Sequence, residues 1–438
     1  MDAKQLARDI FLRTMEAVDV SASISRCISC AGHILRCGDI EYDLRSASDL
    51  RIIAVGKAAH GMIDGFLELL PAGTRVTGIV SAPMLPKKHH SGLHYFLGGH
   101  PIPNEQSLLA GEAALHLLRN CEPERLVIVL LSGGGSALME TPLLADMSLT
   151  DIQHLNRVLV TCGASISEMN AIRKHVSAVK GGRLAQAAGP ASVITLAISD
   201  VPVGSESALA SGPTLPDPTT CEDVQAIIQR HNLQDRLPKP LIEWIENREM
   251  PETPKPDHPI FKRSHFQLVL GMHELFHAAH RISESQDCIT CCDNSTDDWP
   301  LEDAVNALLA QLEQLRAATP RHPVALIADG EISCKVTGDG LGGRNSAFVL
   351  ACAEKIAGKG IVVLSAGTDG IDGNSPAAGA ICDGQTLSRA AEANLDPKDF
   401  YCRSDAFRFF EALGDAIVTG PTGNNLRDFR LLIAFPPG

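Results

Sequence analysis

The sequence predicts an α/β fold with two domains. Short apolar runs rich in Val, Ile and Leu alternate with segments of helical periodicity, the pattern of a mostly parallel sheet covered by helices. The chain has 438 residues, which is more than one hydrophobic core usually supports. Six prolines fall between Pro238 and Pro259, and this stretch is the best candidate for a linker between the two domains.

The first domain is therefore expected over residues 1–236, the linker over 237–259 and the second domain over 260–438. Residues 1–18 carry apolar side chains at helical spacing together with three acids, which predicts a structural helix and not a targeting peptide. Strands of the first domain are expected at 51–56, 76–81, 125–131 and 192–199. A second series is expected at 266–271, 323–331, 361–367 and 428–435.

Composition narrows the class of function. Acidic residues outnumber basic ones by 52 to 38, a formal net charge of −14, which argues against nucleic-acid and anionic-membrane partners. A few local cations can still form a pocket for an anionic small molecule. No apolar run approaches the length of a membrane span. The 13 cysteines show no paired zinc-site spacing, so we expect reduced thiols and a cytoplasmic enzyme.

Polar loops follow several of the expected strands at their carboxyl ends, where ligands of such sheets bind. The turn Ser132-Gly133-Gly134-Gly135-Ser136 follows the strand at 125–131. Its three glycines let peptide N–H groups turn toward an anion, so it is a candidate site for phosphate or carboxylate. The alternative is a tight strand-to-helix turn without a ligand. Asp200 ends the strand at 192–199 and opens a loop of Ser, Gly and Pro.

Lys57 follows the strand at 51–56, where an ammonium group can act as a point charge on phosphate. The surrounding sequence is not a P-loop, and GxGxxG is also absent, which weighs against a dinucleotide fold of the usual kind. A merely solvated lysine at a helix start would oppose the helix dipole. Four further basic residues either form an ordinary helical face or add positive potential: Arg173, Lys174, Lys180 and Arg183.

Two segments of the second domain also carry candidate residues. Arg344, in Gly342-Gly343-Arg344-Asn345, precedes a helical run, and its planar fork can bind carboxylate or phosphate. Asp369 and Asp372 lie among glycines, where paired acids suit Mg²⁺ and Asp-Gly turns are the alternative. The polar turn at 418–425 is expected to be a hairpin and not a site, unless the fold brings it beside the other segments.

Taken together, these segments resemble the class II glycerate kinases, the glycerate 2-kinases with a C-terminal MOFRL domain. The resemblance covers nearly the whole chain and rests on collinear motifs. They are GKAAHGM (56–62), GGHPIPNEQS (98–107), LLSGGGSALMETP (130–142), NAIRKHVSAVKGGRLA (170–185), SDVPVGSESALASGPT (199–214), GDGLGGRNSAF (338–348), GTDGIDG (367–373) and GPTGNN (420–425).

The resemblance implies ATP- and Mg²⁺-dependent phosphorylation of D-glycerate at its 2-hydroxyl. It also implies a Rossmann-like N-terminal domain and a smaller α/β C-terminal domain, with the site in the cleft between them. The functional lysine and arginine of the family fall on Lys57 and Arg344. We then expect residues 132–136 to cradle ATP phosphates, Asp200 and Asp369 to help hold Mg²⁺, and Asp200 to be a weak candidate for the proton acceptor.

The chain departs from the family pattern at several positions. The usual SDVPGD reads SDVPVGSES here, so an acid expected near residue 204 is missing, and it is open whether Glu206 replaces it. The usual GGE reads Asp329-Gly330-Glu331, and GPTGTN reads GPTGNN. These changes leave room for another short hydroxy acid as substrate. Two rival hypotheses are an NAD(P)-linked hydroxypyruvate reductase and a non-catalytic sugar-acid sensor. The protein is expected to be a monomer or homodimer.

Overall fold

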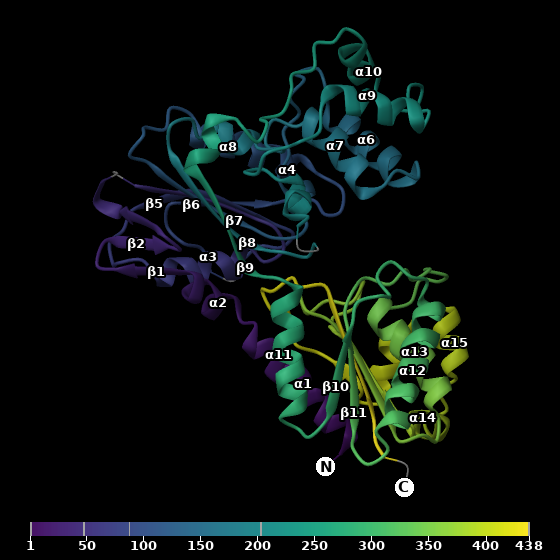
Figure 1. Ribbon diagram of the computed structural model, residues 1–438. Coiled ribbons are helices and arrows are strands. Elements are labelled where there is room, and N and C mark those ends of the chain that lie inside the picture. Colours follow the sequence, from purple (N-terminus) through teal and green to yellow (C-terminus); the bar gives the residue numbers. More distant parts are fainter. Residues whose placement is uncertain (1, 47–48, 87, 202–203, 437–438) are drawn as a thin grey trace. The chain divides into compact units, whose positions relative to one another are not determined.

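The computed structural model describes residues 2–46, 49–86, 88–201 and 204–436 and separates the chain into two compact units (Figure 1). One unit comprises Val20–Val269, here called the sheet-B unit. The other comprises Met1–Asp19 together with Leu270–Gly438, here called the MOFRL-side unit. This division does not coincide with the expected domains, because the first helix lies with the C-terminal half and the chain crosses over at Val269–Leu270, not at 237–259.

Six strands form the main sheet of the sheet-B unit in the spatial order β6-β5-β4-β7-β8-β9. Their bounds are β4 Leu50–Val55, β5 Val76–Ala82, β6 Leu93–Leu97, β7 Leu126–Leu131, β8 Ser192–Ile198 and β9 Ser264–Leu270. The pairs from β6 through β8 are all parallel. Numbered along the chain, this is the order 3-2-1-4-5-6 of the Rossmann fold, which reverses direction between β4 and β7. The Rossmann-like prediction is thus confirmed.

Helices cover both faces of this sheet. Ile53, Val55, Val127 and Val129 point to one face and share a core with α4 (Glu105–Leu118) and α8 (Arg183–Ala187). The opposite face carries α3 (Ala59–Glu68), which contacts α2 (Val20–Cys27) (Figure 1). Alternating side chains of continuous apolar strands therefore serve both layers, as expected for a buried parallel sheet. A small antiparallel sheet, which the sequence reading missed, is formed by β1 Ile28–Ala31, β2 Ile34–Cys37 and β3 Ile40–Asp43.

The proline-rich stretch expected as a linker is part of a helical core instead. This core joins α6 (Leu149–Thr161), α7 (Ile166–Val176), α9 (Cys221–Arg230) and α10 (Lys239–Glu246). Leu241 is fully buried and Trp244 is 7 % exposed. The prolines flank an amphipathic helix whose apolar side chains pack inward, so proline content alone was a misleading signal. Capping boxes begin three of these helices, with Ser148, Ser165 and Thr220 at the N-caps.

The MOFRL-side unit contains a six-stranded mixed sheet in the order β10-β11-β15-β12-β13-β14. Its strands are β10 Ile289–Asp293, β11 Val324–Ala328, β12 Ile361–Gly367, β13 Gly379–Asp383, β14 Ala416–Ile417 and β15 Asp428–Ala434. Only the β10–β11 pair is parallel, and the others are antiparallel. One face packs on α12 (Leu301–Ala318), α13 (Arg344–Ile356) and α16 (Ala406–Ala412). Two further helices are α14 (Thr386–Glu392) and α15 (Pro397–Cys402).

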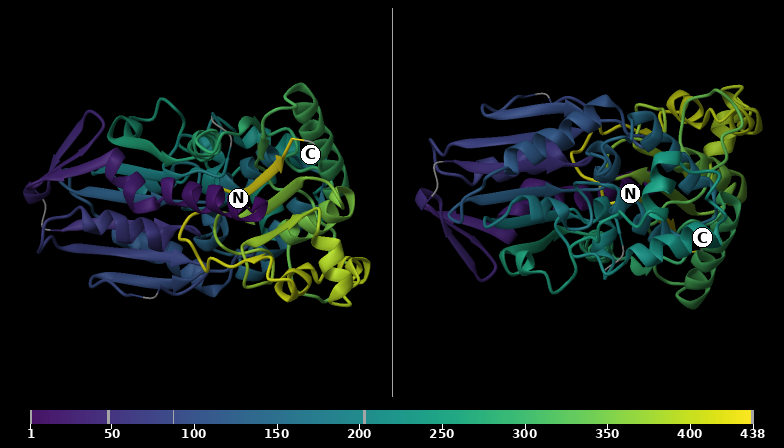
Figure 2. Two further views of the ribbon diagram at one scale, coloured as in Figure 1. Left: turned by 90° about the horizontal axis from the view of Figure 1, so that it is seen from below. Right: turned by 90° about the horizontal axis from the view of Figure 1, so that it is seen from above.

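The other face of this sheet packs against α1 (Ala3–Ala17) and α11 (Met272–Glu284). Figure 2, left, shows the purple α1 beside the yellow β15. The rings of Phe11 and Phe429 have centroids 5.7 Å apart, and the buried Lys4 Nζ lies 2.7 Å from Asp415 Oδ2. The helix predicted from the apolar pattern of residues 1–18 is therefore confirmed. Phe429, which Phe11 of this helix contacts, lies more than 400 residues away in the sequence. No helix in the described ranges is long and apolar enough to cross a membrane.

Candidate functional site

The Gly-rich turn and Lys57 meet at the point where the strand order of the first sheet reverses. β4 and β7 are direct neighbours, with Val55 opposite Leu131, so the residues that follow them come together. The Lys57 N–H donates to the Gly133 carbonyl over 2.9 Å, and the Ala58 N–H donates to the Ser132 hydroxyl over 3.0 Å. Lys57 is thereby fixed against the turn at the position where ligands of Rossmann sheets bind.

Gly134 occupies a position in the turn where only glycine fits well. Its φ of +81° is left-handed, and an added Cβ would lie 2.9 Å from His100 Cδ2 and 3.5 Å from Lys57 Cγ. Gly135 is enclosed as well, because a Cβ there would lie 2.8 Å from Ala210 Cβ. The glycines thus let the backbone pass close to three other segments, and they bring His100 of the GGHPIPNEQS motif beside Lys57.

The segment Glu206–Ser211, a 3₁₀ turn, supports the end of the Gly-rich turn. The Ser136 and Ser211 hydroxyls lie 3.0 Å apart, and Ser211 donates onward to Asn170 Oδ1 over 3.1 Å. Ala210 and Ser211 both have positive φ, at 47° and 59°. Two consecutive non-glycine residues in this conformation store strain, which is typical of backbone held for a function. Sequence reasoning did not single out Ser211 or Asn170, although both lie inside quoted motifs.

Asp200 lies just beyond the carboxyl end of β8, the strand next to β7. It is half-buried, while Ser199 before it is buried. The departure from the family pattern that follows begins at Val203, which lies, like Pro202, outside the described residues. Glu206, considered as a replacement acid, accepts a hydrogen bond from the Gly204 N–H over 2.8 Å.

The basic residues at 173–183 have structural partners. Lys174 Nζ lies 3.3 Å from Asp217 Oδ1, Lys180 pairs with Glu140, and both pairs are buried. Arg183 donates to the Pro251 carbonyl over 2.9 Å. These contacts favour the structural interpretation of this basic segment over a contribution to an anion pocket.

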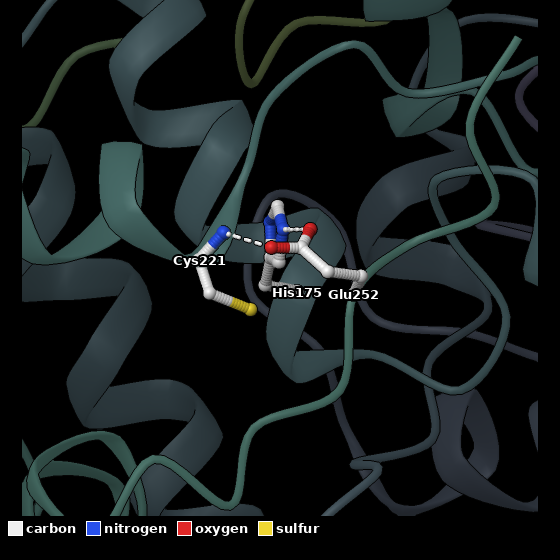
Figure 3. Close-up of side chains that lie close together, drawn as sticks. All are labelled: His175, Cys221 and Glu252. Atoms are coloured by element: carbon white, nitrogen blue, oxygen red, sulfur yellow. Dashed lines mark hydrogen bonds and ion pairs between the residues drawn. The ribbon is translucent and has the colours of Figure 1, made fainter.

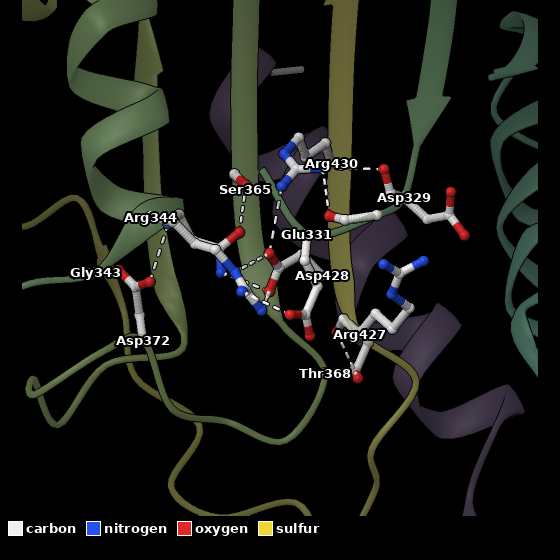
Figure 4. Close-up of polar contacts among 12 residues, drawn as sticks. Asp329, Glu331, Gly343, Arg344, Ser365, Thr368, Asp372, Arg427, Asp428 and Arg430 are labelled. Atoms are coloured by element: carbon white, nitrogen blue, oxygen red, sulfur yellow. Dashed lines mark hydrogen bonds and ion pairs between the residues drawn. The ribbon is translucent and has the colours of Figure 1, made fainter. Parts of the chain in front are cut away.

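In the MOFRL-side unit, Arg344 is the first residue of α13 and is held by two carboxylates (Figure 4). Its Nε donates to Asp428 Oδ2 over 2.6 Å, and its Nη1 donates to Glu331 Oε2 over 2.8 Å. Burial disfavours the charged guanidinium, but Asp428 and Glu331 outweigh burial and raise the pKa of Arg344. About one third of the side chain remains exposed, so the fork is oriented yet reachable.

The two acids of the GTDGIDG motif have separate roles. Asp372 is buried and caps α13, because its carboxylate accepts from the N–H groups of Gly343, Asn345 and Ser346. Asp369 is half-buried, and its Oδ1 accepts from the Ile371 N–H over 3.0 Å. A carboxylate that caps a helix so fully has little capacity for a metal, so the paired-acid interpretation does not extend to Asp372.

A row of buried charges on β15 and after β11 was missed by sequence reasoning (Figure 4). Asp428 and Arg430 are two positions apart on strand β15 and share one face of it. Arg430 is fully buried, and its Nη1 donates to the carbonyls of Asp329 and Gly330. Arg427 pairs with Asp297. The detectable signal was a period-two pair of charges, Asp428 and Arg430, at the start of an otherwise apolar strand.

The polar turn at 418–425 lies against the GTDGIDG turn and does not form a hairpin. The Thr422 hydroxyl donates to the Thr368 carbonyl over 2.5 Å, and the Thr422 N–H donates to the Asp369 carbonyl over 3.2 Å. Asn424 donates to the Val18 carbonyl over 2.8 Å. Motifs 50 residues apart in the sequence thus form one polar loop cluster in this unit.

Comparison with known proteins agrees with this architecture. A family profile described as a domain of unknown function, DUF4147, matches residues 6–246, more than half of the chain, and the MOFRL family profile matches residues 324–428. A D-glycerate 2-kinase from Thermotoga maritima is 32 % identical over 86 % of this chain and 88 % of its own length. A putative hydroxypyruvate reductase from Agrobacterium vitis is 37 % identical over 76 % of each chain. The crystal structure of a glycerate kinase from Thermotoga maritima superposes with a TM-score of 0.81 at 29 % identity, covering 99 % of both chains.

The chain belongs to the class II glycerate kinase family.

As a class II glycerate kinase, the chain carries its candidate residues in both matched regions. The DUF4147 match contains Lys57, the Gly-rich turn and Asp200, and the MOFRL match contains Arg344 and Asp369. The MOFRL match ends at Asp428, the buried carboxylate that orients Arg344. Of the two candidate cations of this glycerate kinase, Lys57 lies in the sheet-B unit and Arg344 in the MOFRL-side unit.

Proposed function

We propose that this protein transfers the γ-phosphoryl group of ATP to the 2-hydroxyl of D-glycerate, giving 2-phospho-D-glycerate and ADP. The observation that carries the proposal is the contact of Lys57 with a three-glycine turn at the reversal point of a Rossmann sheet, in a chain of this family. Relatives named glycerate 2-kinase and glycerate kinase support the choice of reaction.

The Gly-rich turn is proposed to bind the ATP phosphates. Residues Ser132, Gly133, Gly134, Gly135 and Ser136 would present backbone N–H groups and hydroxyls to the phosphate oxygens. A side chain at Gly134 would collide with His100, so the shape of this turn depends on glycine. Lys57 would add a positive charge beside the transferred group.

Each unit is proposed to offer one candidate ligand for Mg²⁺, Asp200 in the sheet-B unit and Asp369 in the MOFRL-side unit. Both are half-buried carboxylates on loops that follow strands. Mg²⁺ prefers oxygen ligands and usually takes only one or two protein carboxylates, with water and substrate phosphates completing its shell. The residues present therefore fit the ion, which when bound would neutralise phosphate charge. The Ile371 N–H donates to Asp369 Oδ1, which helps to orient this carboxylate.

In the proposed transfer, the 2-hydroxyl oxygen forms a bond to the γ-phosphorus while the bond from that phosphorus to the bridging oxygen of ADP breaks. The hydroxyl proton passes to a carboxylate, for which Asp200 is the candidate. Arg344 would bind the glycerate carboxylate or the transferring phosphoryl group with its planar fork. Its orientation by Asp428 and Glu331 means that little side-chain entropy is lost on binding.

Another short hydroxy acid remains the second candidate substrate, because the loop after Asp200 departs from the family pattern. An NAD(P)-dependent hydroxypyruvate reductase is the third candidate, favoured only by the names of the Agrobacterium vitis relatives. The lack of GxGxxG at the β4 turn argues against that activity. We further propose that the enzyme is cytoplasmic, acts on a free small molecule and is a monomer or homodimer.

The deciding experiment measures ADP release with ATP, Mg²⁺ and D-glycerate, and identifies the product as 2- or 3-phosphoglycerate by NMR. Lys57→Ala should lower kcat/KM at least ~100-fold if Lys57 acts on the transferred phosphate. Lys239→Ala is the matched control, since Lys239 is also a lysine near the start of a helix but is exposed on α10. Turnover with hydroxypyruvate and NADH, or none with any hydroxy acid, would contradict the proposal.

A further inference from the structure

A second group of chemically reactive side chains lies in the helical core of the sheet-B unit (Figure 3). His175 comes from the last turn of α7, Cys221 is the first residue of α9, and Glu252 lies in the segment after α10. The ligand atoms of these three residues all lie within 4.8 Å of one another. They belong to none of the strand ends that carry the proposed kinase site.

The hydrogen bonding of His175 fixes which of its ring nitrogens is available. The residue is fully buried, and its Nδ1 lies 2.8 Å from the Ala171 carbonyl oxygen. Because a carbonyl oxygen only accepts, Nδ1 carries the proton, and Nε2 of the neutral ring presents a lone pair. A backbone carbonyl that holds Nδ1–H in this way is the usual support of a metal-binding imidazole.

The Nε2 atom has no hydrogen-bond partner, although it is buried. Glu252 Oε2 lies 3.5 Å from it, and both atoms are acceptors when the ring is neutral. An acceptor that is buried and unsatisfied calls for an explanation, and a cation placed beside Nε2 would give this nitrogen a partner.

Cys221 and Glu252 are held in position beside this nitrogen. The Cys221 N–H donates to Glu252 Oε1 over 2.9 Å, and Lys255 Nζ lies 2.7 Å from Glu252 Oε2. The Cys221 thiol donates to the Met250 carbonyl over 3.2 Å. A thiol that coordinates a cation is deprotonated, so binding at Cys221 Sγ would release one proton.

We propose that His175 Nε2, Cys221 Sγ and a Glu252 carboxylate oxygen bind one divalent cation of the zinc class. Thiolate and imidazole ligands select Zn²⁺ over Mg²⁺. Tetrahedral bonds of about 2.0–2.3 Å require ligand atoms roughly 3.3–3.8 Å apart, so the group has to contract by only about 1 Å. Three protein ligands leave a fourth position for water. The ion would link α7, α9 and the segment after α10. This proposal does not depend on the proposed kinase activity.

Cobalt titration of the metal-free full-length protein tests the site, because Co²⁺ bound to thiolate has a charge-transfer absorption band. The titration is made in a His277→Gln background, since the exposed His273 and His277 on α11 have Nε2 atoms 2.7 Å apart and would bind cobalt themselves. We expect one equivalent of Co²⁺ with the band. Cys221→Ser should abolish the band and weaken binding at least ~100-fold, and Glu252→Gln should weaken it at least ~10-fold.

Cys162→Ser is the matched control. Cys162 is another half-buried cysteine at the edge of the same core, with its thiol donating to the Leu159 carbonyl over 3.1 Å. It should leave the band and the affinity unchanged. Zinc should also raise the melting temperature of the parent but not of Cys221→Ser. A band that survives in Cys221→Ser, a cobalt complex without the band, or binding weaker than ~10 µM overturns the proposal.

Discussion

Asp329 offers the sharpest test of the electrostatics in the MOFRL-side unit. Its side chain is 1 % exposed, and neither carboxylate oxygen makes a hydrogen bond (Figure 4). Burial raises the pKa of Asp329 to about 6, against an opposing effect of Arg427. The residue stands where the family pattern has glycine, so a neutral residue is compatible with the fold at this position. The perturbation is Asp329→Asn.

The sign of the effect follows from proton binding. An unfolded aspartate loses its proton near pH 3.8, whereas folded Asp329 holds it until about pH 6. Between these values the folded state binds more protons, so this residue lowers the free energy of unfolding as pH rises from about 4 to about 6. The difference corresponds to about 3 kcal/mol above pH 7. Relative to wild type, Asp329→Asn should therefore be about 3 kcal/mol more stable at pH 8 than at pH 4.

Urea unfolding at several pH values measures this difference. The chain has two tryptophans, and Trp244 lies in the other unit, so a Trp244→Phe background lets Trp299 report on the MOFRL-side unit alone. With a urea dependence of about 2–3 kcal/mol per molar, the variant's midpoint should move by roughly 1 M between the two pH values relative to wild type. The unpaired asparagine amide has its own cost, but that cost does not depend on pH.

Glu331→Gln is the control, because it also removes a carboxylate from this segment. The Glu331 side chain is 43 % exposed. It should change the free energy of unfolding by less than about 1 kcal/mol. A difference between Asp329→Asn and wild type that is the same at pH 4 and pH 8 would refute the reasoning, since it would mean that Asp329 is ionised alike in both states.

Three further predictions concern packing and the proposed site. Gly134→Ala should raise the KM for ATP at least ~10-fold, whereas Gly73→Ala, with a similar φ of +85° and no neighbour within 4 Å, should leave it unchanged in saturation kinetics. Asp428→Asn should lower the free energy of unfolding by about 3–5 kcal/mol in urea, because it leaves the fully buried Arg430 without its carboxylate. Trp244→Ala should lower it by about 3 kcal/mol by calorimetry, whereas a flexible linker would tolerate the change.

Local sequence patterns were sufficient for the elements that a single segment specifies. The apolar runs at 51–56, 125–131 and 192–199 became β4, β7 and β8 with ends shifted by one residue at most. A continuous apolar run can only be buried on both faces, so its structure and its layer follow directly from composition. The position of Lys57 and the Gly-rich turn after their strands followed for the same reason.

The sequence alone misassigned elements whose partners lie far away. The strand expected at 266–271 in the second domain is β9 at the edge of the first sheet, and the helix of residues 3–17 packs on β12 and β15. An amphipathic pattern indicates that one face of a helix is buried, but it does not indicate which element covers that face. The expected linker at 237–259 rested on its prolines. The sequence does not show that Trp244 in this stretch packs into a helical core.

The sequence by itself determined the fold class, the family and the strand ends that carry Lys57, the Gly-rich turn and Asp200, because glycine spacing and apolar periodicity are local properties. Only the tertiary structure decided which charges are partners. Asp428 meets Arg344 across 84 positions of sequence, and Asp372 caps the helix that Arg344 begins. His175, Cys221 and Glu252 converge from three separate segments. Ion pairs, caps and metal ligands act over a few ångströms, and the distance between two side chains is set by chain topology and not by residue type.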